Sequence, residues 1–134
     1  VATHSHPECA RQMRVEHWQN GVKQGAAAAR TMLGRGQTYD EVHWFWSDQY
    51  DANIQYAGFH VPWDQVVVRG SLAERKFLAF FLTAGRVESA VAINQGRDLR
   101  RAFPLIRARV PVDPSRLADP QVDLRTLVPA EKPT

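Results

Sequence analysis

The chain has 134 residues, of which 44% are hydrophobic and 23% are charged, and its formal net charge is +3. This length suits one domain of common size, and the composition is that of an ordinary globular protein. The single cysteine excludes an internal disulfide framework and favours a reducing compartment, so we expect a cytoplasmic protein. No apolar run approaches the ~20 residues of a membrane span, and no Lys/Arg run indicates nucleic-acid binding. We therefore expect neither a membrane nor a nucleic acid as partner.

Residues 1–14 show no hydrophobic periodicity, and we predict an irregular segment. His4, His6 and His17 suggest a metal cluster, but no cysteine or carboxylate stands at ligand spacing, so we expect no metal. Cys9 is either a reactive thiol beside charged neighbours or an incidental one, and the incidental thiol is favoured.

A helix is predicted from about Trp18 to Leu33, with Asn20 as a cap near its start, Arg30 in its last turn and Gly34 as its stop. Small residues at 25–29 suit close approach to another layer of structure. The helix carries one narrow apolar stripe of Val22, Ala26, Ala29 and Leu33. Because one such helix makes a poor domain, we expect its packing partner to lie outside this segment.

The segment 44–51 (WFWSDQYD) combines four aromatic residues with a hydroxyl, an amide and two carboxylates. Strand alternation predicts Trp44, Trp46 and Asp48 on one face. It predicts Phe45, Ser47 and Gln49 on the other. Such a strand is either half buried in a core or forms a wall beside a planar ligand or partner, and composition alone favours the core strand.

Four further strands are predicted at about 53–59, 65–70, 76–82 and 86–93, separated by Gly, Pro and Asp turn signals. A hairpin connection at 83–85 and short links favour an antiparallel meander. A helix follows at about 95–108, and Pro104 should kink or split it. We expect the Pro-rich tail from Pro111 to wrap the surface, with one turn at 114–117. The predicted class is α+β, an antiparallel sheet with flanking helices.

Leu99, Phe103 and Ile106 are predicted to line one face of the 95–108 helix, and arginines the other: Arg97, Arg100, Arg101 and Arg107. These arginines form either a solvated face or a docking patch for an acidic protein. Nucleic-acid binding is a third option, which the acidic residues among the aromatics oppose. The chain has no Gly-rich phosphate loop, no Cys pair and no nucleophilic Ser elbow, so we name no catalytic residue.

Three motifs occur in order, at residues 14–20 (RVEHWQN), 24–30 (QGAAAAR) and 44–51, with further matches at 54–58 (IQYAG), 68–70 (VRG) and 92–94 (AIN). They resemble the flavin-dependent ferredoxin reductases of oxygenase systems, the group of putidaredoxin reductase and apoptosis-inducing factor. In that family a Gly-Asp pair that holds the flavin ribityl chain comes just before the position of Val1. The chain thus resembles the C-terminal third of such an enzyme.

The resemblance implies that residues 1–40 end an FAD-binding domain, 41–128 form the reductase C-terminal domain and 129–134 are a tail. It implies FAD and NAD(P)H as cofactors of the full-length protein and a ferredoxin-type iron–sulfur protein as partner. We expect this chain, which lacks both dinucleotide fingerprints, neither to hold FAD tightly nor to turn over alone. The alternative is a stand-alone interaction module with this fold and no redox activity.

By the family pattern, Glu16, His17 and Trp18 begin a helix whose Trp18 N–H meets the pyrimidine edge of the flavin. Trp46 is expected to face the isoalloxazine and the ferredoxin, with Trp44 and Tyr50 as supports. Arg97, Arg100 and Arg101 are expected to join the docking surface.

Glu16 is expected to pair with Arg14, and Asp48 to bond neighbouring loop amides, both in structural roles. His43 departs from the family, which usually has proline there, and so does Gly21, where alanine is common.

Overall fold

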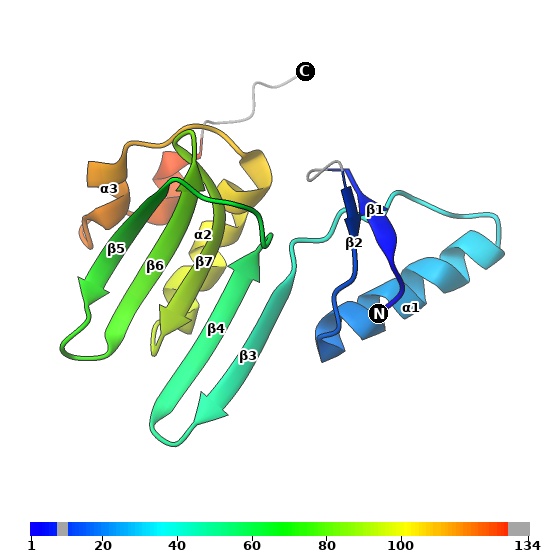
Figure 1. Ribbon diagram of the computed structural model, residues 1–134, viewed down its shortest axis with the longest axis horizontal. Coiled ribbons are helices and arrows are strands. Elements are labelled where there is room, and N and C mark those ends of the chain that lie inside the picture. The colour runs from blue at the N-terminus through cyan, green and yellow to red at the C-terminus, as the bar shows by residue number, and fades with distance from the viewer. Residues whose placement is uncertain (8–10, 129–134) are drawn as a thin grey trace.

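The computed structural model describes residues 1–7 and 11–128. A two-stranded sheet and the long helix α1 lie on one side of the molecule, and a five-stranded sheet with the remaining helices lies on the other (Figure 1). The predicted tail at 129–134 and Cys9 lie outside the described residues.

The first residues are more regular than predicted. β1 (His4–His6) and β2 (Arg11–Met13) pair antiparallel, with His4 opposite Met13. His6 and Met13 are buried, and the other four residues of the two strands are half buried or exposed. The prediction of an irregular segment was wrong because three-residue strands are too short to produce a detectable alternation.

Helix α1 (Trp18–Met32) ends as predicted, with Arg30 in its last turn and Gly34 beyond it at φ +69°. Its predicted cap is wrong. His17 occupies the N-cap position, and Asn20 lies inside the helix, where its Nδ2 donates to the Val15 carbonyl at 2.7 Å. The side-chain Oδ1 of Asn20 accepts from the Tyr39 hydroxyl, so this side-chain amide links the helix to the chain before it and after it.

The large sheet has the strand order β3-β4-β7-β6-β5, and every neighbouring pair is antiparallel. Its strands are β3 (Trp44–Gln49), β4 (Ala52–Gly58), β5 (Gln65–Ser71), β6 (Lys76–Thr83) and β7 (Arg86–Ile93). The predicted hairpin at 83–85 is present, and Ala84 and Gly85 both have positive φ, as a type I′ turn requires.

The meander prediction was correct for the pair β3–β4 and for β5, β6 and β7, but it was wrong for the step from β4 to β5. Residues 59–64 carry the chain from β4 to the far edge of the sheet, and β7 returns to pair with β4. This pairing joins residues 31 to 39 positions apart, so short links between successive strands could not indicate it.

One face of the sheet is covered by α2 (Gly96–Ala108), α3 (Pro114–Ala118) and the 3₁₀ helix η1 (Leu124–Leu127), which lie behind the strands in Figure 1. α2 continues through Pro104, so of the two predicted outcomes, a kink or a split, the split was wrong. Pro104 and Arg100 lie on the exposed side, where water can satisfy the carbonyl that the proline leaves without a donor. The tail is also less superficial than predicted, because Leu117 and Leu124 are fully buried.

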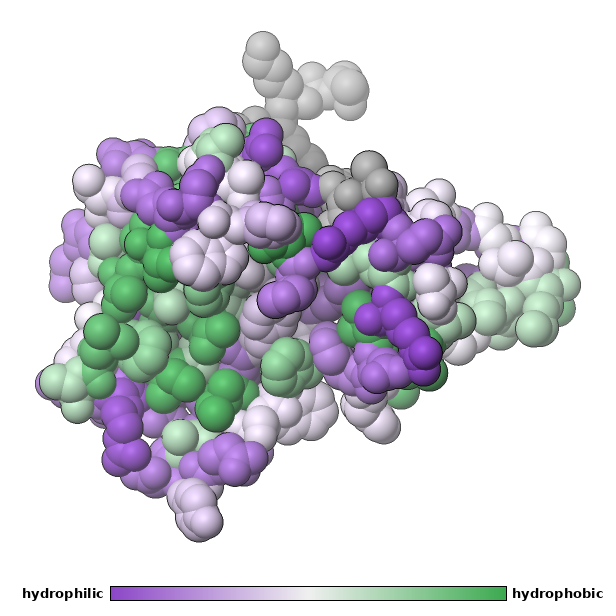
Figure 2. All heavy atoms as spheres, in the orientation of Figure 1, coloured by the Kyte–Doolittle hydropathy of each residue, from purple (hydrophilic) through white to green (hydrophobic). Residues whose placement is uncertain are grey.

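The core lies between the sheet and these helices, and its largest fully buried side chains include Phe59, Phe80, Leu78, Leu82, Leu99, Leu105 and Ile106. The opposite face, which we call the open face, is apolar and is not covered by any helix in the described part of the chain. Directly paired residues place Phe45, Tyr56, Val91, Ala79 and Val68 in one row across it. Figure 2 looks onto this face and shows hydrophobic residues spread over it.

Candidate functional site

Two tryptophans stack on the helix-covered side of the edge strand β3. Trp44 and Trp46 have ring centroids 5.0 Å apart and an interplanar angle of 27°. Trp44 is half buried against the core, whereas Trp46 is 44% exposed. The predicted alternation is therefore confirmed, and it presents one indole of a stacked pair to the surface.

Trp18 completes an aromatic wall of three indoles with Trp44 and Trp46. Its ring meets Trp46 edge to face, with centroids 6.3 Å apart and planes at 83°. The wall, His17, Gln19 and Phe45 line a shallow cavity of about 210 Å³. Because Trp18 opens α1 and Trp46 lies in β3, the wall spans the two parts of the molecule.

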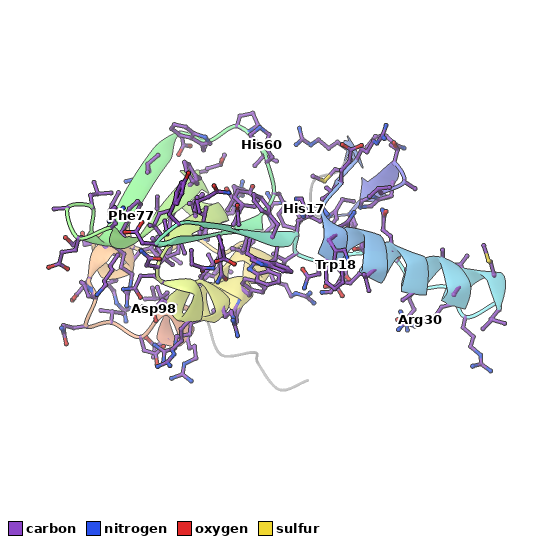
Figure 3. The ribbon with its side chains drawn as sticks, turned by 90° about the horizontal axis from the view of Figure 1, so that it is seen from below. His17, Trp18, Arg30, His60, Phe77 and Asp98 are labelled. Atoms are coloured by element: carbon purple, nitrogen blue, oxygen red, sulfur yellow. The ribbon has the colours of Figure 1, made fainter. Side chains whose placement is uncertain are left out.

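The backbone N–H groups at the start of α1 are available to a hydrogen-bond acceptor. His17, at the N-cap, provides no side-chain hydrogen bond to the helix, and the first turn contains no acidic residue. The first N–H groups of a helix lack partners within the helix and carry a partial positive charge. Figure 3 shows His17 and Trp18 at this end of α1, beside the sheet, and Arg30 at the far end. The cavity thus combines an apolar wall with the positive end of a helix.

His17 turns its ring toward the sheet, where it contacts Phe45 with centroids 4.8 Å apart. Burial lowers the pKa of His17, although a hydrogen bond with the backbone of Trp44 partly opposes this shift. Glu16 forms the predicted ion pair with Arg14 at 2.7 Å, and both side chains are about two-thirds exposed.

The other predicted site residues are spread around the molecule. Tyr50 is fully exposed in the turn between β3 and β4, so it does not pack as a support beneath Trp46, and its place on the docking surface stays a prediction. Arg97 and Arg100 are exposed on α2, whereas Arg101 pairs with Asp98 at 3.0 Å. The predicted arginine patch is therefore not one continuous cluster of unpaired cations.

The sequence reasoning missed the side chains that hold the tryptophans. Gln55, opposite Trp46 in β4, accepts a hydrogen bond from the Trp44 indole N–H at 3.2 Å. Asp48 accepts from the side chain of Asn53 rather than from the loop amides that we expected. An amide on the core side of a strand beside two tryptophans was the available signal, because buried polar groups need partners.

Four histidines gather where residues 1–43 meet the large sheet. The ring of His43 lies 5.5 Å from that of His6, 6.1 Å from His4 and 6.3 Å from His17. Burial, followed by the neighbouring imidazoles, lowers the pKa of His43 to about 4. Within residues 1–7 and 11–128, no group of three or more His, Cys, Asp or Glu side chains is arranged to hold a metal ion. No helix in the same ranges is long and apolar enough to cross a membrane.

Comparison with known proteins identifies the fold. The reductase C-terminal family matches residues 44–128, and the chain belongs to this family. The ferredoxin–NAD(+) reductase component of the anthranilate 1,2-dioxygenase system of Burkholderia cepacia is 43% identical over 129 residues. That match covers 96% of this chain and 32% of the relative, so the chain spans about a third of the relative's length.

Two solved structures agree with this assignment. The ferredoxin reductase of the CYP199A2 system from Rhodopseudomonas palustris superposes with a TM-score of 0.84 at 35% identity. The covalent complex of putidaredoxin reductase with putidaredoxin gives 0.85 at 30% identity. The matches cover 91% and 93% of this chain and 30% of each reductase chain, which confirms the resemblance and the α+β fold expected from the motifs.

Proposed function

We propose that this chain is the C-terminal part of a flavoprotein that passes electrons from NAD(P)H through FAD to a ferredoxin-type iron–sulfur protein. The observation that carries the proposal is the open, positive start of α1 beside the wall of Trp18, Trp46 and Trp44. The names of the relatives support the same activity, since both are ferredoxin reductases and one belongs to a dioxygenase system.

The residues of this chain fit one edge of a flavin. The N–H groups at the start of α1 would hold the pyrimidine edge, where reduced flavin carries negative charge. The indole of Trp46 would exclude water beside the ring system and offer one donor. A flavin held there would supply hydride acceptance from NAD(P)H and single-electron transfer to the iron–sulfur protein.

Most of the cofactor contacts are expected from outside this sequence. The apolar stripe of α1 is exposed, with Val22 at 54% and Leu33 at 71%, which supports assignment of residues 1–40 to an FAD-binding domain. The same exposure disfavours the alternative of a self-sufficient interaction module. We propose the acidic surface of the iron–sulfur protein as the partner of exposed Trp46, Arg97 and Arg100.

The first test uses the chain alone. Purified protein should carry no flavin absorbance, because only one edge of the site is present. Flavin bound in stoichiometric amount would contradict the division of the site between this chain and a preceding domain.

The second test uses a chimera in which this chain replaces the matching C-terminal part of the Burkholderia cepacia reductase. The chimera should bind FAD and reduce a ferredoxin in the presence of NADH.

Trp46→Ala should slow ferredoxin reduction about tenfold, the effect of losing one well-placed positioning contact of 1–2 kcal/mol. The matched control is Trp63→Ala, because Trp63 is 54% exposed, against 44% for Trp46, but lies away from the wall, against Phe81. Equal rates for the two variants would contradict the role of Trp46.

A further inference from the structure

A line of side-chain hydrogen bonds runs from Trp44 to Asp48 on the helix-covered face of β3 and β4. The Trp44 indole N–H donates to Gln55 Oε1 at 3.2 Å, and Gln55 Nε2 donates to Asn53 Oδ1 at 2.8 Å. Asn53 Nδ2 then donates to Asp48 Oδ1 at 2.6 Å.

The direction of every bond in this line is fixed by its two ends. An indole N–H can only donate, and an ionised carboxylate can only accept. The amides of Gln55 and Asn53 must therefore each turn the oxygen toward Trp44 and the NH₂ toward Asp48. The backbone holds Asn53 as well, because its N–H donates to Asn94 Oδ1 at 2.8 Å and its carbonyl accepts from the Asn94 N–H at 2.9 Å.

The Gln55 amide is also enclosed sterically. Gln55 is 8% exposed and lies against Gly96, the first residue of α2. A Cβ atom at position 96 would stand 2.2 Å from Gln55 Nε2, which is too close for the two to coexist. The absence of a side chain at Gly96 is thus what allows Gln55 to occupy the position from which it reaches Trp44.

We propose that Gln55 is the positioning residue of the tryptophan wall: its amide fixes the plane of Trp44, and Trp44 in turn fixes exposed Trp46 by stacking. Without this bond, Trp44 retains its apolar contacts but loses the polar contact that selects one ring orientation. Trp46 then presents its indole to the cofactor and partner in several orientations instead of one. The functional meaning of this ordering rests on the proposed reductase activity, whereas the ordering itself is a property of this chain.

The test is far-UV circular dichroism of the purified chain, because two stacked indoles couple and produce a paired positive and negative band. Trp18 and Trp46 couple as well, so the Trp44–Trp46 couplet is defined as the part of the signal that Trp44→Phe abolishes. Gln55→Met, which keeps the size of the side chain but cannot accept from the indole, should remove most of the couplet. Gly96→Ala should cause the same loss by displacing the Gln55 amide. Gln49→Met is the matched control and should keep the couplet, since Gln49 is exposed and its side-chain amide donates to Ser47 rather than to the tryptophans.

If Gln55 stabilised the fold without fixing the orientation of Trp44, the result would be different. Gln55→Met would then lower the midpoint of thermal unfolding while the folded protein kept its couplet, and this outcome overturns the proposal. If Gln55→Met does not fold, Gly96→Ala decides: a retained couplet overturns the proposal, and a lost couplet supports it. Neither measurement needs flavin or a partner, so an inactive chimera with an intact Gln55-dependent couplet would refute the proposed function and leave this inference standing.

Discussion

His43 is a residue whose ionisation is coupled to the fold. It is 5% exposed, and its Nε2 has no hydrogen-bond partner among the described residues. Its ring lies between those of His4, His6 and His17 and against Phe59. A proton on His43 would place a charge among these rings without an acceptor, so the folded protein keeps this imidazole neutral.

The chain should therefore lose stability in mild acid. The pKa of His43 is about 4 in the folded chain and 6.5 in the unfolded chain. Between these pH values the unfolded chain therefore binds a proton at His43 and the folded chain does not. The free energy of unfolding is unaffected by His43 above pH 6.5 and falls as the pH drops to about 4, by at most ~3 kcal/mol. His17, whose pKa is also lowered, contributes with the same sign.

Urea unfolding of His43→Leu between pH 4 and 7.5 measures this contribution. The variant should show a shallower fall in stability with acid than the parent chain. His60→Leu is the control and should leave the slope unchanged, because the His60 ring is exposed to water in the folded protein. Identical slopes for the parent and His43→Leu would contradict the assignment.

At the scale of elements, one buried arginine attaches the C-terminal segment to the sheet. Arg69 in β5 is 7% exposed, and its guanidinium donates to four backbone carbonyls. The acceptors lie in and after α3, at Leu117, Asp119, Pro120 and Val122. A planar guanidinium with several donors suits this arrangement, and a lysine ammonium cannot reach the same set.

Arg69→Met should lower the free energy of unfolding by about 3 kcal/mol, because four carbonyls lose a charged donor in a buried site. Arg69→Lys should recover only part of this loss. Arg116→Met, at an exposed position on α3, should stay within about 0.5 kcal/mol of the parent. Chemical denaturation measures all three, and equal stability of Arg69→Met and Arg116→Met would show that the carbonyl contacts carry no net energy.

How much of these elements a sequence can reveal depends on the range of the interactions that form them. β5, β6 and β7 were predicted closely because alternation and turn residues are local signals. The pairing of β4 with β7 is long-range, and so are the contacts of Arg69 with the C-terminal segment. In the candidate site, alternation predicted the shared face of Trp44 and Trp46, but Gln55 reaches them only through the fit against Gly96, which no local pattern shows.

At the scale of the whole molecule, two apolar surfaces stand uncovered among the described residues, the stripe of α1 and the open face of the sheet. Val66 and Val68 on the open face are 42% and 38% exposed. Soluble proteins seldom leave apolar patches of this extent without a partner. The chain spans about a third of the reductase it matches at 43% identity, so a preceding domain is the partner we expect for α1.

Substitutions on α1 can distinguish a helix that packs on a preceding domain from a helix whose apolar stripe stays exposed to water. In the chain alone, Val22→Lys should change stability by no more than about 0.5 kcal/mol, because Val22 already faces water. In the chimera with the Burkholderia cepacia reductase, the same lysine would be buried against the FAD-binding domain without a partner. It should weaken FAD retention and lower the unfolding temperature there, since an unpaired charge is costly to bury.

Ala28→Lys, exposed and about a third of a turn away from the stripe, should leave both proteins unchanged. If Val22→Lys is harmless in the chimera as well, α1 does not pack on that domain through this stripe, and residues 1–40 must be assigned differently.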